Sequence, residues 1–331
     1  MTYVIGVDGG GSKTFCLAVR LDGTITGFGK AGPGSYEVVG IEKAKENILQ
    51  SVEEALTWSH ASKEDVEVGC FALAGADFYP EDFEMLTAAM QDLGVAKKVL
   101  IKSDAIAGLR AGAGRTYGVV IIMGSGFNGA GIGKDGREIR YFAEGHIFGD
   151  MGGGGSIARD AMFHAFRAYD GRGKPTVLMQ RVLEHFEAGD MEQLARLLFY
   201  HRESWKKIPS LCPTVFEAAC EGDEVASEII HKYGEEAGIS ANAIIRRLGL
   251  EKEEFEVVLA GSVFKGKGSL MLDTARDIIL AVAPKAKVIT PRYEPVVGAL
   301  MLALEEAGVA IEGDVQRRLH ASVPEELRRD C

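Results

Sequence analysis

The chain has 331 residues, of which 47% are hydrophobic and 26% are charged, and its net charge at pH 7 is -11. This length is enough for about two domains with substantial cores, and the composition is typical of a globular protein in water. The acidic balance argues against a nucleic-acid-binding protein, which would carry a basic face, but it does not exclude a nucleotide ligand.

The cysteines and the absence of targeting signals indicate a cytoplasmic protein. Five cysteines form no C-x-x-C pair and are odd in number, so we expect reduced thiols. Cys70 lies inside an apolar run and is expected in the core. No basic segment followed by an apolar region opens the chain, and no run of about 18 apolar residues occurs, so neither a secretory signal nor a membrane span is predicted. The cysteines are Cys16, Cys70, Cys212, Cys220 and Cys331.

Residues 4–30 form the first stretch with a chemical signature. An apolar run ends in Asp8, is followed by Gly-Gly-Gly-Ser-Lys-Thr at 9–14, and a second apolar run ends at Asp22-Gly23. A two-residue Asp-Gly between apolar runs is typical of a hairpin. The stretch therefore predicts a meander of antiparallel strands, with the glycines in a turn.

This glycine turn fits neither of two common phosphate-binding motifs. Ser12 separates Gly11 from Lys13, unlike a Walker A loop, and a strand follows the glycines, where a Rossmann fingerprint requires a helix. A hairpin tip with several backbone N–H groups remains, and such a tip suits an anion. Asp8 beside it suits magnesium, which binds through one or two carboxylates, waters and phosphates. An ordinary turn is the alternative, although three consecutive glycines are entropically costly for a turn alone.

Helices and strands alternate after the meander. A third strand near 25–29 leads into a loop at 31–36, and apolar residues at helical spacing predict a helix over 41–58. The expected elements that follow are a strand at 66–73, a helix at 81–93, a strand at 99–102 and a helix at 105–113.

The same order then begins again. An apolar run at 119–123, a Gly-Ser-Gly turn and a strand at 127–132 repeat the first hairpin, and Asp135-Gly136 closes the copy. The later expected elements are a third strand at 138–142, helices at 156–168, 216–219, 225–248, 270–283 and 296–307, strands at 255–259 and 287–289, and a helical insertion at 176–212 without visible chemistry.

Two copies of one strand and helix order predict an internal duplication with a cleft between two lobes. The first lobe is expected to span 1–117 and the second 118–295, including the insertion. The closing helical region within 296–331 is expected to pack back on the first lobe.

This duplicated pattern resembles the actin-like ATPase superfamily and, more narrowly, the BadF/BadG/BcrA/BcrD ATPase family with its N-acetylglucosamine kinase members. The resemblance implies an α/β fold of two ribonuclease H-like domains, each a three-strand meander plus alternating helices and strands. The matching segments cover nearly the whole chain in the family's order: 7–14, 73–77, 103–105, 124–128, 148–150, 259–264 and 295–299.

The resemblance also implies roles for individual residues. Asp104, at a strand end, matches the catalytic aspartate of the amino-sugar kinases, and Asp8 is expected to hold Mg2+ through water. The residues expected to bind ATP are Gly10, Gly11, Ser12, Lys13, Thr14, Gly124, Ser125, Gly126, Gly261, Ser262 and Lys265. The residues expected to bind the sugar are Ser35, Ser125, Asn128, Gly145, His146 and Asp150.

The implied activity is ATP-dependent phosphorylation of a hydroxyl of an amino sugar: N-acetylglucosamine, glucosamine or N-acetylmuramate. This chemistry needs charge stabilisation at the phosphates and a carboxylate that accepts the hydroxyl proton. Two glycine loops on one nucleotide also imply domain closure, which excludes water. Ser35 stands where many relatives have Asn, and Met151 where human-type N-acetylglucosamine kinases have Glu. The N-acetyl sugar is therefore a weaker inference than the kinase.

Three alternative functions differ in the residues that they require. A ROK-type glucokinase typically carries a Cys-rich zinc motif, which this sequence lacks. An ATPase activator of 2-hydroxyacyl-CoA dehydratase or benzoyl-CoA reductase needs cluster cysteines after the second hairpin, and none lies between Cys70 and Cys212. A nucleotide-binding regulatory protein without catalysis stays open. Relatives are often dimers, so a homodimer is compatible with the resemblance.

Some of these residues also have plainer explanations. Asp104 could be the cap of the helix that follows it, and Asp150 a turn residue among glycines. Asp77 could cap a helix or contact the waters of the metal. His146 fits a pocket wall better than a metal ligand, because no second His or Cys lies at ligand spacing.

Overall fold

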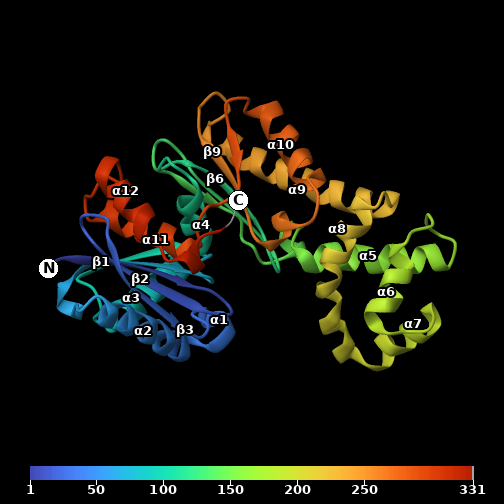
Figure 1. Ribbon diagram of the computed structural model, residues 1–331, viewed down its shortest axis with the longest axis horizontal. Helices are drawn as coiled ribbons and strands as arrows, with labels where there is room; N and C mark the ends of the chain where they lie inside the picture. Colours follow the sequence, from blue (N-terminus) through green and yellow to red (C-terminus); the bar gives the residue numbers. More distant parts are fainter. Residues whose placement is uncertain (330–331) are drawn as a thin grey trace.

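The computed structural model describes residues 1–329 and contains two five-stranded sheets of the same design (Figure 1). The first sheet has the order β3-β2-β1-β4-β5, and the second has the order β10-β9-β6-β7-β8. The strands of the first sheet are β1 Tyr3–Gly9, β2 Thr14–Arg20, β3 Ile25–Ala31, β4 Val66–Leu73 and β5 Lys98–Ser103. Those of the second are β6 Gly118–Met123, β7 Phe127–Ile132, β8 Glu138–Arg140, β9 Glu256–Ala260 and β10 Lys287–Ile289.

The pairing directions also repeat. β1 is antiparallel to β2 and parallel to β4, while β6 is antiparallel to β7 and parallel to β9. The outer pairs follow the same rule, since β2–β3 and β7–β8 are antiparallel whereas β4–β5 and β9–β10 are parallel. The predicted duplicated fold is therefore confirmed.

Both faces of the first sheet are covered by helices because its strands are apolar on both sides. In β1, Ile5 and Val7 pack in the layer of α2 and α3, whereas Val4 packs in the opposite layer with α11 and α12. We call this sheet with these helices the first lobe. Its helices are α1 Tyr36–Val39, α2 Ile41–Trp58, α3 Glu81–Asp92, α11 Pro295–Glu306 and α12 Gly313–Ser322.

The second sheet has a larger set of helices, which we call, with the sheet, the second lobe. α9 and α10 share one core with this sheet, while α5 to α8 extend to one side (Figure 1). Helices α6 and α7 form a small core of their own together with α5. The helices are α5 Gly154–Tyr169, α6 Leu178–Phe186, α7 Met191–Tyr200, α8 Cys212–Cys220, α9 Glu224–Leu248 and α10 Leu270–Val282.

Two helices join the lobes. α4 (Asp104–Gly112) follows the fifth strand of the first sheet, and α11 follows the fifth strand of the second. α4 packs on the second sheet through Ile106 and Leu109, and α11 packs on the first. The helices touch backbone to backbone, since a Cβ added at Gly298 would lie 1.9 Å from the carbonyl oxygen of Ala107.

The structure differs from the expected elements mainly near the C-terminus. The helix expected at 296–307 is present as α11, which ends at Glu306 before Gly308 at φ of 79°, a conformation that favours glycine, and the remaining part of the closing region contains a separate helix, α12. Part of the loop expected at 31–36 begins the short helix α1, and the third strand of the second sheet ends at Arg140. The 3-10 segments are Lys63–Asp65, His146–Phe148, Arg202–Leu211, Ser262–Lys265 and Glu325–Leu327.

Two further expectations concern cysteines and membranes. Cys16, Cys70, Cys212 and Cys220 are free thiols, and Cys70 is buried as expected, whereas Cys331 lies outside the described residues. Within residues 1–329, no helix has the length and apolar character needed to cross a membrane.

Candidate active site

The first glycine turn is held by backbone bonds at its base. The N–H of Gly10 donates to the carbonyl of Lys13 at 3.0 Å, and the N–H groups of Gly34 and Ser35 donate to the carbonyl of Gly10 at 3.0 and 3.2 Å. The tip at Gly11 is exposed. The turn is therefore anchored below and open above, as a loop that holds phosphate should be.

Asp8, at the end of β1, lies among charged groups from distant parts of the chain. Burial raises the pKa of Asp8 to about 7, and the negative charges of Asp104 and Glu294 add to this effect. Lys13 and Arg329 act in the opposite direction. Asp8 is thus a carboxylate whose ionised form is disfavoured until a cation reaches it.

Asp104 is the first residue of α4, at the end of β5. Its neighbour Ser103 caps the helix, because the Ser103 hydroxyl oxygen accepts the N–H of Ala105 at 3.3 Å. Asp104 is therefore not needed as the cap. Burial raises the pKa of Asp104 above its ordinary value, while bonds from Ala105 and Ser103 partly offset this.

Glu294 and Arg329 belong to this cluster but were missed from the sequence. Nε and Nη2 of Arg329 donate to the two carboxylate oxygens of Glu294 at 3.0 and 3.1 Å. Burial opposes ionisation, but Arg329, Lys13 and Lys265 lower the pKa of Glu294. The last segment that resembles the family begins at residue 295, one position after Glu294. The available signal was the duplication, since Glu294 precedes α11 where Asp104 begins α4.

The second glycine turn lines a cavity of about 520 Å3. The N–H of Gly124 donates to the carbonyl of Gly126 at 3.0 Å, and a Cβ at either glycine would meet no atom within 4 Å. Gly261 has φ of 104°, and its Cβ would lie 2.2 Å from the carbonyl oxygen of Met123, so only glycine fits. The cavity contains Gly124, Ser125, Ser262 and Lys265 of the predicted nucleotide-binding residues.

The opposite wall of this cavity comes from a region for which no function was predicted. Pro209 and Ser210 precede α8, and Cys212 and Phe216 belong to it. The ring of Phe216 occupies the space where a Cβ of Gly266 would lie, at 2.5 Å. The end of the predicted insertion at 176–212 therefore helps to form the cavity.

A neighbouring cavity of about 500 Å3 collects the residues expected around the sugar. Ser125 lines both cavities, so they meet at the second glycine turn. Oδ2 of buried Asp150 accepts the N–H of Gly145 at 2.8 Å, which fixes the loop between them. Predicted residues that line this cavity are Ser125, Gly126, Gly145, His146 and Asp150, together with Met151.

Two predicted sugar-binding residues lie elsewhere. Ser35 is buried beneath the first glycine turn, and neither it nor Asn128 lines the two cavities. Oδ1 of Asn128 accepts the N–H of Gly129 at 2.7 Å.

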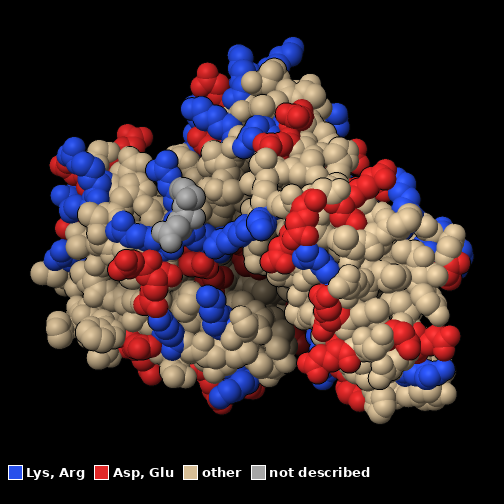
Figure 2. Space-filling model, turned by 45° about the vertical axis from the view of Figure 1, so that its right-hand side comes forward, with Lys and Arg blue, Asp and Glu red and all other residues tan. Residues whose placement is uncertain are grey.

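Carboxylates continue from Asp104 across to the second lobe. Oxygens of Glu37, Asp77 and Glu144 lie within 4.8 Å of one another. Burial raises the pKa of Asp77 to about 7, and Asp104, Glu37 and Glu144 add to the shift. Asp82, not Asp77, accepts the backbone N–H of residues 77 and 78 ahead of α3. Figure 2 shows acidic side chains in the hollow between the lobes, below a row of Lys and Arg side chains.

The residues present fit a magnesium nucleotide. Gly124 and Gly126 leave open space beside their backbone, and the first turn is open at Gly11. Asp104 lies close enough to Asp8 for its charge to raise the pKa of Asp8, and a divalent cation would remove the cost of ionising Asp8. Carboxylate oxygens next to open glycine turns are the donors that Mg2+ and phosphate use.

Two sheets of one repeated order, with a nucleotide-sized cavity beside a glycine turn, define the actin-like ATPase fold. Among solved structures, a candidate N-acetylglucosamine kinase from Chromobacterium violaceum superposes with a TM-score of 0.68 at 23% identity, covering 92% of this chain and 99% of that one.

The sequence matches the model of the BadF/BadG/BcrA/BcrD ATPase family over residues 5–303, and the chain belongs to this family. It is 30% identical over 306 residues to the N-acetylmuramic acid/N-acetylglucosamine kinase of Clostridium acetobutylicum, covering 92% of this chain and 99% of the relative. It is 31% identical over 312 residues to the N-acetyl-D-glucosamine kinase of Dictyostelium discoideum, covering 91% and 97%. The expected family is therefore confirmed.

Proposed function

We propose that the protein transfers the γ-phosphoryl group of ATP to a hydroxyl of an amino sugar, with Asp104 as the general base. Family membership and the kinases among its relatives identify it as an ATP-dependent sugar kinase. The observation that carries the finer proposal is the position of Asp104, enclosed beside Asp8 at the end of β5. The acceptors we propose are N-acetylglucosamine, glucosamine and N-acetylmuramate, which include the sugars named for the two relatives.

The charges around Asp104 suit a base. A carboxylate whose pKa is raised above its ordinary value accepts a proton more readily near neutral pH. Oδ of Asp104 takes the proton of the sugar hydroxyl as the hydroxyl oxygen attacks phosphorus. The breaking bond joins the γ-phosphorus to the bridging oxygen of ADP, which leaves with the electron pair.

Groups around the phosphates stabilise the charge that moves during transfer. Lys13 and the backbone N–H groups of the two glycine turns face the phosphates in this proposal, and Asp8 would hold Mg2+. When bound, magnesium ATP supplies the phosphoryl group and the cation that offsets its negative charge. In this proposal the adenosine occupies the cavity of the second lobe that Ser262, Lys265 and Phe216 line.

The sugar occupies the second cavity in this proposal. Ser125 lies at the junction of the two cavities, where acceptor and phosphate must meet. Asp150 fixes the loop that carries His146. Met151 presents an apolar side chain to the cavity and is the residue we expect to influence the choice among amino sugars.

The test is ADP release from magnesium ATP, measured by a coupled assay with a panel of hexoses, amino sugars and N-acetyl amino sugars. We expect strong stimulation by an amino sugar and its loss in Asp104→Asn, with ADP binding retained. Stimulation only by a plain hexose would contradict the substrate class. An Asp104→Asn variant with full activity would contradict the base.

A further inference from the structure

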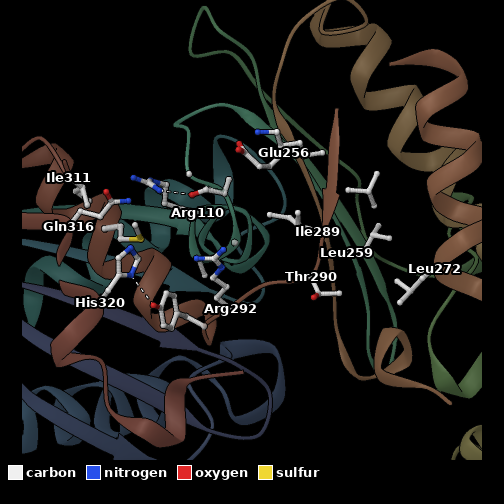
Figure 3. Close-up of a pocket in the computed structure, with 18 of the residues that line it drawn as sticks. Arg110, Glu256, Leu259, Leu272, Ile289, Thr290, Arg292, Ile311, Gln316 and His320 are labelled. Carbon is white, nitrogen blue, oxygen red and sulfur yellow. Dashed lines mark hydrogen bonds between the residues drawn. The ribbon is translucent and has the colours of Figure 1, made fainter. Parts of the chain in front are cut away.

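A third cavity, of about 630 Å3, is larger than either cavity of the active site. Figure 3 shows it between the helices α11 and α12 on one side and β9, β10 and α10 on the other. No residue assigned above to ATP, magnesium or the sugar lines it. The proposed kinase activity therefore leaves this cavity without a role.

Its walls are unusually positive for a protein with a net charge of -11. Glu256 is its one carboxylate, whereas four cationic side chains line it: Arg110, Arg276, Lys287 and Arg292. Arg110 is paired with Glu305 and Arg276 with Asp273. Within residues 1–329, Arg292 and Lys287 have no ion-pair partner, and both are exposed.

A flat aromatic surface lies beside Arg292. The rings of Tyr293 and His320 stack with centroids 5.5 Å apart, and the Tyr293 hydroxyl lies 2.8 Å from Nδ1 of His320. Burial lowers the pKa of His320, and the charges of Arg292 and Arg328 lower it further. Leu259, Ile289 and Leu272 add apolar surface across the cavity (Figure 3).

We propose that this cavity binds a small organic phosphate monoester and that the bound ligand regulates the active site. Its volume is that of small-molecule pockets, which span roughly 300–1,000 Å3. The guanidinium of Arg292, next to the aromatic pair, recognises the phosphate because Arg matches its oxygens in pairs, and Lys287 on the wall from the second lobe adds positive potential. The aromatic pair and the apolar wall take the carbon skeleton.

Three consecutive residues, 292–294, connect this cavity to the active site. Arg292 and Tyr293 line the cavity, and the next residue, Glu294, carries the charge beside Asp8. The carbonyl of Arg292 accepts the N–H of Arg329 at 2.8 Å, and the side chain of Arg329 binds Glu294. A ligand that draws Arg292 toward it therefore acts on the segment that positions Glu294.

The walls also come from both lobes. His320 belongs to α12 of the first lobe, whereas Lys287 belongs to β10 of the second. A ligand that contacts both lobes favours one separation between them. By thermodynamic linkage, this ligand changes the affinity of the protein for nucleotide by the same factor as nucleotide changes the affinity for the ligand.

Binding is tested by isothermal titration calorimetry of the full chain saturated with magnesium ADP, which keeps the probes out of the phosphate turns. The probes are inorganic phosphate, 3-phosphoglycerate and glycerol 3-phosphate, with glycerol as the uncharged control. We expect at least one phosphate to bind, Arg292→Ala to weaken this binding by about tenfold, and Lys287→Ala to weaken it by a smaller factor of about threefold. Two matched variants outside the cavity, Arg317→Ala and Lys285→Ala, should bind as the unmodified protein does.

Regulation is tested by the affinity for ADP with and without the bound phosphate compound. We expect a change of about fivefold or more that disappears in Arg292→Ala. No binding of the three phosphates, or equal binding by the cavity and control variants, overturns the site. Binding that leaves the ADP affinity unchanged overturns the regulation. Neither readout requires a phosphorylated sugar, so the result is independent of the proposed kinase reaction.

Discussion

In the first lobe, residues 32–65 join the third strand to the fourth, whereas the corresponding connection in the second lobe runs from 141 to 255. The short connection carries two α-helices, and the long one carries α5 to α9. The common strand order provides one glycine turn in each lobe. The long connection adds the walls of both cavities, including Asp150 and Phe216.

The lobes also differ in charge at equivalent positions. β1 carries Asp8 next to its last residue, whereas β6 ends in Ile122-Met123. The helix after the fifth strand begins at Asp104 in the first lobe and is preceded by Glu294 in the second. Glu294 is neutralised by Arg329, while Asp104 is not so paired within residues 1–329. The duplication thus supplied two similar positions, of which one keeps a basic carboxylate.

The largest expected effect is on kcat, and it should differ between variants of Asp104 and of Glu294. Asp104→Asn should lower kcat by about 1,000-fold, because the base is lost. Glu294→Gln should lower it only about tenfold, because Glu294 acts through its charge beside Asp8. Steady-state kinetics with magnesium ATP and the preferred sugar measure both. A Glu294→Gln variant as impaired as Asp104→Asn would mean that the two positions share the chemistry.

The contact between α4 and α11 gives the next effect. Gly298→Ala should lower the free energy of unfolding by about 3 kcal/mol, since its Cβ would overlap the Ala107 carbonyl. Gly108→Ala on the partner helix is the control, because its nearest neighbour is Ile122 at 3.6 Å. It should raise stability by about 0.5 kcal/mol through helix propensity. Urea denaturation measures both, and equal effects would contradict the close contact.

Asp8 is expected to decrease stability at high pH. Its folded pKa of about 7 lies above the ordinary 3.8, so the folded state holds the proton more tightly. Stability from this group is complete below pH 3.8 and is lost as the pH rises to 7.

Asp8→Asn should therefore stabilise the magnesium-free protein by about 2 kcal/mol at pH 8, a gain that shrinks toward pH 4. Thermal unfolding in EDTA at several pH values measures this. Added Mg2+ should stabilise the unmodified protein but not the variant. A gain that is the same at pH 4 and pH 8 would rule out the ionisation of Asp8 as its cause.

The smallest effect tests the wall supplied by the long connection. Phe216→Leu should raise the KM for ATP by about fivefold, because the ring supports Gly266 next to Lys265. The KM for the sugar should not change. Phe186→Leu, in the separate core of α6 and α7, is the control and should leave both values unchanged. A rise in the KM for sugar alone would assign the wall to the other cavity.

The strands and the duplication could be predicted because both depend on local patterns. Apolar runs at 66–73, 127–132 and 287–289 coincide with β4, β7 and β10. The glycine turns could be predicted from the sequence because apolar runs and Asp-Gly pairs flank them. Local pattern was less informative near the C-terminus, where α12 has few apolar residues. Its Leu319 is buried in the core that α11 shares with the first sheet.

The parts that were missed depend on contacts between distant residues. Arg329 reaches Glu294 only because the C-terminal segment pairs with residues 292–294. Phe216 joins the cavity beside the second glycine turn only because α8 folds back against the loop after β9. Ser35 was expected in the sugar site, but burial places it beneath the first turn. The assignments to individual ligands stay predictions.

The point at which α4 and α11 cross, at Gly298, is the hinge between the two lobes. No side chain separates the two backbones there, so the lobes cannot drift apart at that point without losing the contact. Phe78 of the first lobe stacks on Phe142 of the second with ring centroids 5.5 Å apart, and this contact is made by two side chains. A rotation of the lobes can separate two side chains while the two helix backbones stay in contact. Labels at Phe78 and Phe142 should therefore report opening of the cleft more sensitively than labels on the two helices.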